Sequence, residues 1–181
     1  MALPALLAVF SALFGALFGA VVGGGVAGAA EAVGGVDASG TRAPLGQLAE
    51  VTGGPCRNGE GITVVVDPGD LGGPVQVRCV TSSPATGFDL LRDAGYSVDG
   101  VVRQPGFLCR IDGRPSGDPC IDTPPATGYW SYWVADMGGP WCYSELGGTA
   151  RTPVSGTVEG WSFSRGGRDS APRSGTFSHL P

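Results

Sequence analysis

The feature that most constrains the fold is a run of aromatic and hydroxyl-bearing residues, Tyr129-Trp130-Ser131-Tyr132-Trp133. In a β-strand the side chains alternate between two faces, so Trp130 and Tyr132 would share one face and the other three the opposite face. Both faces would then present aromatic rings. If a helix covers one face, the other needs a loop of this chain, a partner protein or a ligand. A loop is the default explanation, because Trp and Tyr are common in small cores.

The remaining patterns predict one β-rich domain with a single helix. Residues 62–66 and 75–80 read as strands, and the turn-rich residues 67–73 between them suggest a hairpin. Residues 83–95 change to helical spacing, with Thr86 placed to cap the helix. Further short strands are expected at 97–103, 107–111, 129–135, 141–145 and 158–163. This order predicts an α+β fold, with one helix packed on a mostly antiparallel or mixed sheet.

Composition narrows the range of partners. The 33 glycines and 15 prolines favour turns and loops over a helical bundle. All 11 basic residues are arginine, and 16 carboxylates set the formal net charge at -5. Phosphate binding needs a basic surface, so nucleic acid is not expected as a partner.

The N-terminal segment predicts export. Residues 3–22 are uncharged and mostly apolar, and Ala27-Gly28-Ala29 has the spacing of a signal-peptidase site. We expect residues 1–29 to be a signal peptide and the protein to be secreted or extracellular. The alternative is an uncleaved segment that anchors the chain to a membrane. The rest divides into a flexible linker at 30–54, a folded domain at 55–165 and a disordered tail at 166–181.

The five cysteines all follow the predicted signal peptide, as in a disulfide-stapled exported domain. Cys109 and Cys120 flank a short turn-rich stretch and are expected to pair. Cys56 would then pair with Cys79, and Cys142 would remain a free thiol, although other pairings stay open. No close-spaced cysteine pairs suggest zinc, so no metal site is predicted.

The sequence offers no catalytic constellation. A serine or cysteine nucleophile needs a base beside it, and the single histidine, His179, lies in the predicted tail. Asp67 with Asp70, and Asp112 with Asp118, lie in Gly/Pro turns where aspartate forms the turn itself. We therefore predict a non-enzymatic protein without a cofactor.

Several segments together resemble a known domain. They are 86–96, 109–113, 129–133, 141–144 and 159–163. This pattern resembles the small β-rich domain that forms the C-terminal half of transcobalamin and intrinsic factor. It is most similar to secreted actinobacterial proteins that carry a transcobalamin-like domain of unknown function, often encoded beside energy-coupling-factor uptake transporters. The similarity covers about residues 56–164.

The resemblance implies a ligand-binding role for the aromatic strands. In transcobalamin a corrinoid is held between this domain and a larger helical barrel, and the Tyr-Trp strand faces the ligand. Carried over by position, the residues near a ligand are Trp130, Tyr132 and Trp133, with Trp141 and Tyr143 as neighbours. Cys109 and Cys120 are additions particular to the exported bacterial group.

The expected function is therefore an exported binding module for a small, corrinoid-like molecule, accessory to a membrane transporter. The alternative is a structural or protein-interaction domain at the cell surface that has no small ligand.

Overall fold

A computed structural model describes residues 51–57, 59–167 and 169–177. The predicted signal peptide at 1–29 and most of the linker at 30–54 lie outside the described residues. No helix in the described part of the chain is both long enough and apolar enough to cross a membrane.

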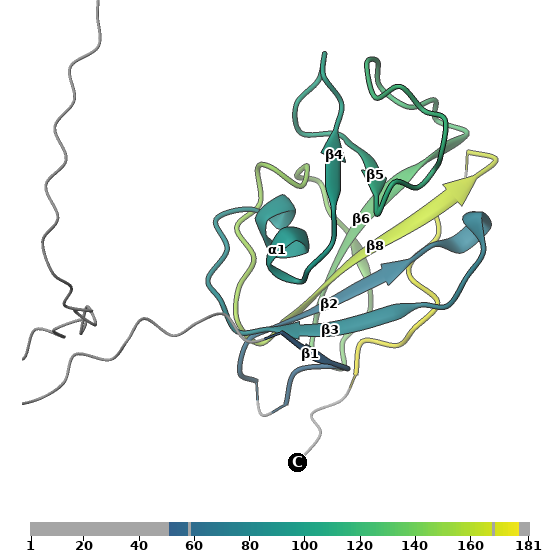
Figure 1. The fold of residues 1–181 in the computed structure, drawn as a ribbon. Helices are drawn as coiled ribbons and strands as arrows, with labels where there is room; N and C mark the ends of the chain where they lie inside the picture. The colour runs from purple at the N-terminus through teal and green to yellow at the C-terminus, as the bar shows by residue number, and fades with distance from the viewer. Residues whose placement is uncertain (1–50, 58, 168, 178–181) are drawn as a thin grey trace, which may run out of the picture. The chain divides into compact units, whose positions relative to one another are not determined.

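The domain is a mixed β-sheet with one α-helix (Figure 1). In chain order the elements are β1 (Val51–Gly53), β2 (Ile62–Asp67), the 3₁₀ helix η1 (Gly69–Leu71), β3 (Gln76–Val80), α1 (Gly87–Asp93), β4 (Val98–Gly100), β5 (Leu108–Ile111), β6 (Gly128–Asp136), β7 (Cys142–Tyr143) and β8 (Thr157–Arg165). The large sheet has the order β1-β3-β2-β8-β6-β7, and β4 and β5 form a second, two-stranded sheet. Strands β2 and β8 are parallel, and the other neighbours are antiparallel. The prediction of a small β-rich domain with one helix is confirmed.

The helix begins and ends where its sequence requires. Thr86 has an extended backbone, and its hydroxyl accepts a hydrogen bond from the Asp89 amide at 3.1 Å, which caps the first turn. Gly95 follows the helix at φ +84°, a conformation that costs a glycine little. The observed helix is shorter than the predicted range 83–95, because the chain before Thr86 remains irregular.

One face of the large sheet, which we call the helix face, carries the main core. The helix contributes Phe88, Leu90 and Leu91, and β5 adds Leu108 and Ile111. They pack on buried side chains of β2, β6 and β8, namely Ile62, Val64, Val66, Trp130, Tyr132, Trp161 and Phe163. Figure 1 shows α1, β4 and β5 on this same side of the sheet.

The opposite face is covered by a later segment of the same chain. Residues 169–177, which we call the C-terminal strap, lie against this second face, which we call the strap face. The Trp141 indole donates a hydrogen bond to the Ser174 carbonyl at 3.1 Å, and Phe177 packs with the apolar residues of the strap face. The prediction of a disordered tail from residue 166 is therefore wrong for the strap. Residues 168 and 178–181 lie outside the described residues.

Close packing at Gly160 shows how near the strap approaches. A Cβ atom at this position would lie 2.8 Å from the Pro172 ring and 2.8 Å from the Trp141 indole. Only a glycine at the centre of β8 leaves room for both side chains.

An ion pair fixes the strap to the end of β2. The Arg173 guanidinium donates to both oxygens of the buried Asp67 carboxylate, at 2.7 and 3.0 Å to one oxygen, and the Arg173 amide donates to the other at 2.7 Å. Burial alone would raise the pKa of Asp67, but the hydrogen bonds from Arg173 and Gly69 outweigh it and hold the pKa below its usual value. The strap thus supplies the cation that a buried carboxylate needs.

The domain also extends further at its N-terminal end than predicted. Strand β1 pairs with β3 from Val51 onward, so residues 51–53 belong to the sheet and not to a linker. The folded domain therefore exceeds the predicted range 55–165 at both ends.

Two disulfides have the predicted pairing, Cys56 with Cys79 and Cys109 with Cys120, and Cys142 is free and exposed. Each closed loop stabilises the fold by about 3 kcal/mol in the chain-entropy model.

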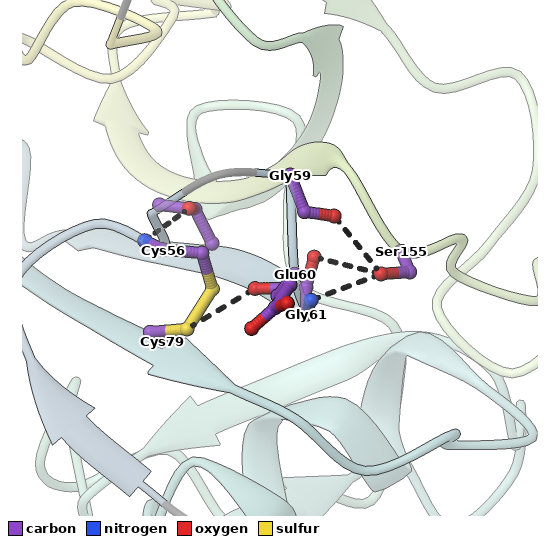
Figure 2. Close-up of a disulfide and its surroundings, with 7 residues drawn as sticks. Cys56, Gly59, Glu60, Gly61, Cys79 and Ser155 are labelled. Atoms are coloured by element: carbon purple, nitrogen blue, oxygen red, sulfur yellow. Dashed lines mark hydrogen bonds between the residues drawn. A yellow bond between two sulfur atoms is a disulfide. The ribbon is translucent and has the colours of Figure 1, made fainter. Parts of the chain in front are cut away.

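Figure 2 shows the surroundings of the Cys56–Cys79 disulfide. The Ser155 hydroxyl lies beside the loop that precedes β2. It accepts from the Gly61 amide at 2.9 Å and lies 3.3 Å from the Gly59 carbonyl oxygen. These contacts connect the disulfide-bearing loop to the turn before β8.

The Arg173–Asp67 pair makes stability depend on pH. Arg173→Gln should lower the melting temperature near neutral pH, because it leaves the Asp67 carboxylate buried without its cation. A depressed folded-state pKa means that the carboxylate stabilises the fold above its unfolded pKa of about 3.9. This contribution is lost as pH falls through the folded pKa. Thermal unfolding followed by circular dichroism should show the variant and wild type converging below about pH 3.9.

The matched control is Arg103→Gln, which removes an exposed arginine paired with exposed Asp122. This change should have little effect at any pH. Equal losses in the two variants, or a difference that grows on acidification, would contradict the assigned role of Arg173.

Candidate functional site

The five aromatic residues predicted near a ligand occupy three different environments. On the helix face, Trp130 and Tyr132 are each 7% exposed. Trp133 and Trp141 are half-buried, and Tyr143 is 45% exposed. The structure therefore does not gather all five around one site.

Trp130 and Tyr132 are core residues whose polar ends are satisfied. The Trp130 indole donates to the Arg114 carbonyl at 3.0 Å, and its ring meets Phe163 edge-on at 5.5 Å. The Tyr132 ring stacks on Trp161 at 4.7 Å. These geometries are those of favourable aromatic packing.

The Tyr132 hydroxyl contacts a buried carboxylate. It donates to Glu159 at 2.5 Å, and the Arg151 guanidinium lies 3.3 Å from the other carboxylate oxygen. Burial raises the pKa of Glu159, while Tyr132 and Arg151 act in the opposite direction. Burial and the adjacent carboxylate also raise the pKa of Tyr132. Tyr132, Glu159 and Arg151 thus satisfy one another's polar groups beside the helix-face core.

Trp141 and Trp133 lie on the strap face. Trp141 lies under the strap, as described above. The Trp133 indole donates to the Ser131 hydroxyl at 2.8 Å, and its ring meets Tyr143 edge-on at 5.3 Å. Neither indole lines the pocket that opens beside the outer edge of β6.

A pocket of about 280 Å³ opens beside the outer edge of β6. Strand β7 pairs only with Trp133 and Val134, so among the described strands none covers this edge of β6 at residues 129–131. The chain then leaves the sheet and crosses to α1, where the Phe88 amide donates to the Gly148 carbonyl at 3.0 Å. The pocket lies between this crossing loop, the start of β5 and β6.

The lining is mainly aromatic and apolar. Trp130, Tyr132 and Trp161 border it from the core, and the remaining lining residues are Phe88, Gly106, Phe107, Leu108, Tyr129, Tyr143, Ser144, Glu145, Leu146, Gly147 and Gly148. Three large side chains are markedly open to solvent: Phe107 at 44%, Tyr143 at 45% and Leu146 at 52%. Exposed apolar side chains gathered around a hollow are typical of a binding surface.

Glycines allow the loops to approach closely enough to form the pocket. A Cβ at Gly148 would lie 2.6 Å from the Phe88 ring, and one at Gly106 would lie 2.9 Å from the Thr149 hydroxyl. Larger residues at these positions would force the Phe88 ring or the Thr149 side chain to move.

Tyrosines and acidic groups meet at the rim. The Tyr129 hydroxyl donates to the Asp169 carboxylate, and Tyr129 also interacts with Tyr143. Burial and the hydrogen bonds to Asp169 and Tyr143 raise the pKa of Tyr129 above its usual value. Of the described residues that line the pocket, Glu145 alone carries a charge.

Sequence reasoning identified Trp130, Tyr132 and Tyr143 at this location but missed Phe107, Tyr129 and Leu146. Phe107 and Leu146 each adjoin glycine, in Gly106-Phe107 and Leu146-Gly147-Gly148. A large apolar residue beside glycine in a turn was the available signal, because such a side chain has little opportunity to enter a core.

Other reactive groups have structural roles. The Asp67 and Asp118 carboxylates accept from the amides two residues later, at 2.9 and 2.8 Å, which confirms their turn-forming role. In the part of the chain that the structure describes, one group of three potential metal ligands occurs, Cys109, Asp118 and Cys120. The two sulfurs of this group are bonded to each other. His179 lies outside the described residues.

Comparisons with protein-family models, with curated proteins and with solved structures found no match to this chain.

The core and rim aromatic residues should respond differently to truncation. Trp130→Ala should reduce the free energy of unfolding by about 3–5 kcal/mol, because it empties a buried site. Tyr143→Ala should cost about 1 kcal/mol or less, since it removes an exposed ring with one aromatic contact. Urea unfolding with unchanged m-values would give both numbers. A large loss for Tyr143→Ala would place this ring in the core and contradict an open rim.

Proposed function

We propose that this protein is an exported, non-enzymatic binding module whose pocket beside β6 holds a small molecule. The observation that carries the proposal is the cluster of exposed Phe107, Tyr143 and Leu146 around one pocket. Leaving these side chains in water forgoes the stabilisation that burial would give, about 25 cal/mol per Å² of apolar surface. A bound ligand would recover part of this free energy.

The resemblance to the transcobalamin-like domain supports the same location. There the Tyr-Trp strand faces the ligand, and here the pocket lies along that strand, β6. The volume of about 280 Å³ is just below the usual range for a pocket that encloses a drug-sized ligand. It suits a small molecule, or one projecting group of a larger molecule such as a corrinoid. A membrane uptake transporter is the proposed recipient of the ligand.

Export is supported by the two disulfides, because such bonds persist in oxidising compartments. The predicted N-terminal export segment is consistent with this proposal.

A protein-interaction domain is the second candidate, and one observation favours it. Val102 and Ile121 are exposed at 70% and 43%, and the backbones around them are joined by hydrogen bonds, Val102 N–H to Cys120 and Arg103 N–H to Ile121. They form a small apolar surface, stapled by the Cys109–Cys120 disulfide, that could contact a partner protein.

The proposed function predicts weak binding at the pocket. The full chain should bind members of a panel of small apolar and aromatic compounds, with cyanocobalamin included, in the micromolar to millimolar range. Ligand-observed saturation-transfer NMR would detect it. Phe107→Ala should abolish the signal, and Val102→Ala should preserve it, because Val102 is exposed but lies outside the pocket.

Absence of binding by the whole panel at millimolar concentration would contradict a small-molecule site and favour the interaction domain. Binding that survives Phe107→Ala but is lost in Val102→Ala would move the site to the Val102–Ile121 surface.

A further inference from the structure

Among the described residues that line the pocket beside β6, the one charged side chain, Glu145, is acidic, and this restricts the ligand further. We infer that the pocket recognises an organic cation with an apolar body, such as a quaternary or alkylated ammonium group. This inference rests on the proposed function and adds the chemical class of the ligand.

Aromatic faces supply the first part of the argument. The electron-rich faces of Trp, Tyr and Phe attract a cation placed within about 6 Å of the ring. Phe107 and Tyr143 are exposed at the pocket, and Tyr129 and Trp130 border it. Ammonium groups that carry alkyl substituents combine positive charge with apolar surface, and a lining that is half aromatic satisfies both.

Carboxylates supply the second part. Glu145 is exposed at the rim, and Asp169 is bound to the Tyr129 hydroxyl, which also interacts with Tyr143. A tyrosine whose hydroxyl donates a hydrogen bond to a carboxylate presents a more electron-rich ring to a ligand. The rim therefore carries negative charge at Glu145, and Asp169 adds a second carboxylate beside Tyr129.

The basic groups closest in sequence or fold are engaged elsewhere. Arg114 donates to the carbonyls of Leu71 and Gly72, and Arg151 approaches the buried Glu159. Arg92 lies over the ring of the lining residue Phe88, but its charge is paired with the Asp89 carboxylate at 3.1 Å. None of the described lining residues is basic. An anionic ligand would meet a carboxylate at the rim without a compensating cation, which disfavours it.

The net charge of the chain acts in the same direction. At -5 the protein attracts cations over a distance of about 8–10 Å at physiological ionic strength. This long-range attraction does not select one ligand over another. It does mean that the net charge of the protein does not repel a cationic ligand.

Three compounds of nearly equal shape separate charge from apolar contact. Choline carries a positive charge, 3,3-dimethyl-1-butanol is its neutral isostere, and 3,3-dimethylbutanoate carries a negative charge. Each has one sharp methyl signal for saturation-transfer NMR titration against the full chain. Choline should bind about tenfold more tightly than the neutral alcohol, and the anion should bind most weakly.

Three variants locate the effect, and two of them remove one negative charge each at different places. Glu145→Gln should weaken choline about two- to fivefold and leave the neutral alcohol unchanged, as expected for an exposed charge. Glu60→Gln makes the same charge change beside the Cys56–Cys79 disulfide (Figure 2), away from the pocket lining, and should alter neither affinity. Tyr143→Leu keeps apolar bulk but removes the ring, so it should weaken choline more than the alcohol.

The outcomes separate the inference from the proposed function. If the neutral alcohol binds as tightly as choline, or the anion binds best, the cation inference is overturned and a binding pocket remains. If Glu60→Gln weakens choline as much as Glu145→Gln, the effect is one of net charge and the inference is also overturned. If none of the three compounds binds, and the panel of small apolar and aromatic compounds shows no binding either, both the inference and the proposed small-molecule function are overturned.

Discussion

A β-sheet with apolar side chains on both faces can be stable in water only if both faces are covered. The helix face is closed by α1 with β4 and β5, and the strap face is closed by residues 169–177. The second closure depends on few contacts: Arg173 with the buried Asp67, the Trp141 indole with the Ser174 carbonyl, and Pro172 against Gly160. Because the chain supplies both covers itself, the aromatic run of β6 is mainly structural.

The parts of the fold that depend on local sequence were predictable. The hairpin of β2 and β3, the Thr86 cap and the turn-flanked Cys109–Cys120 disulfide each depend on residues close in sequence. The strap was not predictable in this way, since its contacts depend on a single arginine and on backbone carbonyls. The contacts form with residues 12 to 106 positions earlier in the sequence, and a segment with so few apolar residues does not indicate that it will pack.

The pocket shows the same limit. Its residues come from the start of β5, from β6 and from the loop after β7, so no single segment contains the pattern. Sequence reasoning found the aromatic strand correctly, yet which rings would remain open was decided by the short β7, which pairs with Trp133 and Val134 only. With both sheet faces closed, the exposed rings collect at the edge of β6. This edge carries the proposed binding site, and its acidic rim carries the proposed preference for a cation.

Hydrogen exchange at the Trp141 indole tests the self-covering of the sheet most directly. Exchange of the tryptophan indole protons can be followed by NMR in the wild-type chain, in Gly160→Ala and in Gly128→Ala. Gly128 has room for a Cβ, whose nearest neighbour would be Phe163 at 3.7 Å, whereas a Cβ at Gly160 would collide with Pro172 and Trp141. We predict slow exchange of the Trp141 proton in the wild type and in Gly128→Ala, and fast exchange in Gly160→Ala, with the Trp130 proton protected in all three. Fast exchange of Trp141 in the wild type would show that the strap does not cover this face, and would contradict the account.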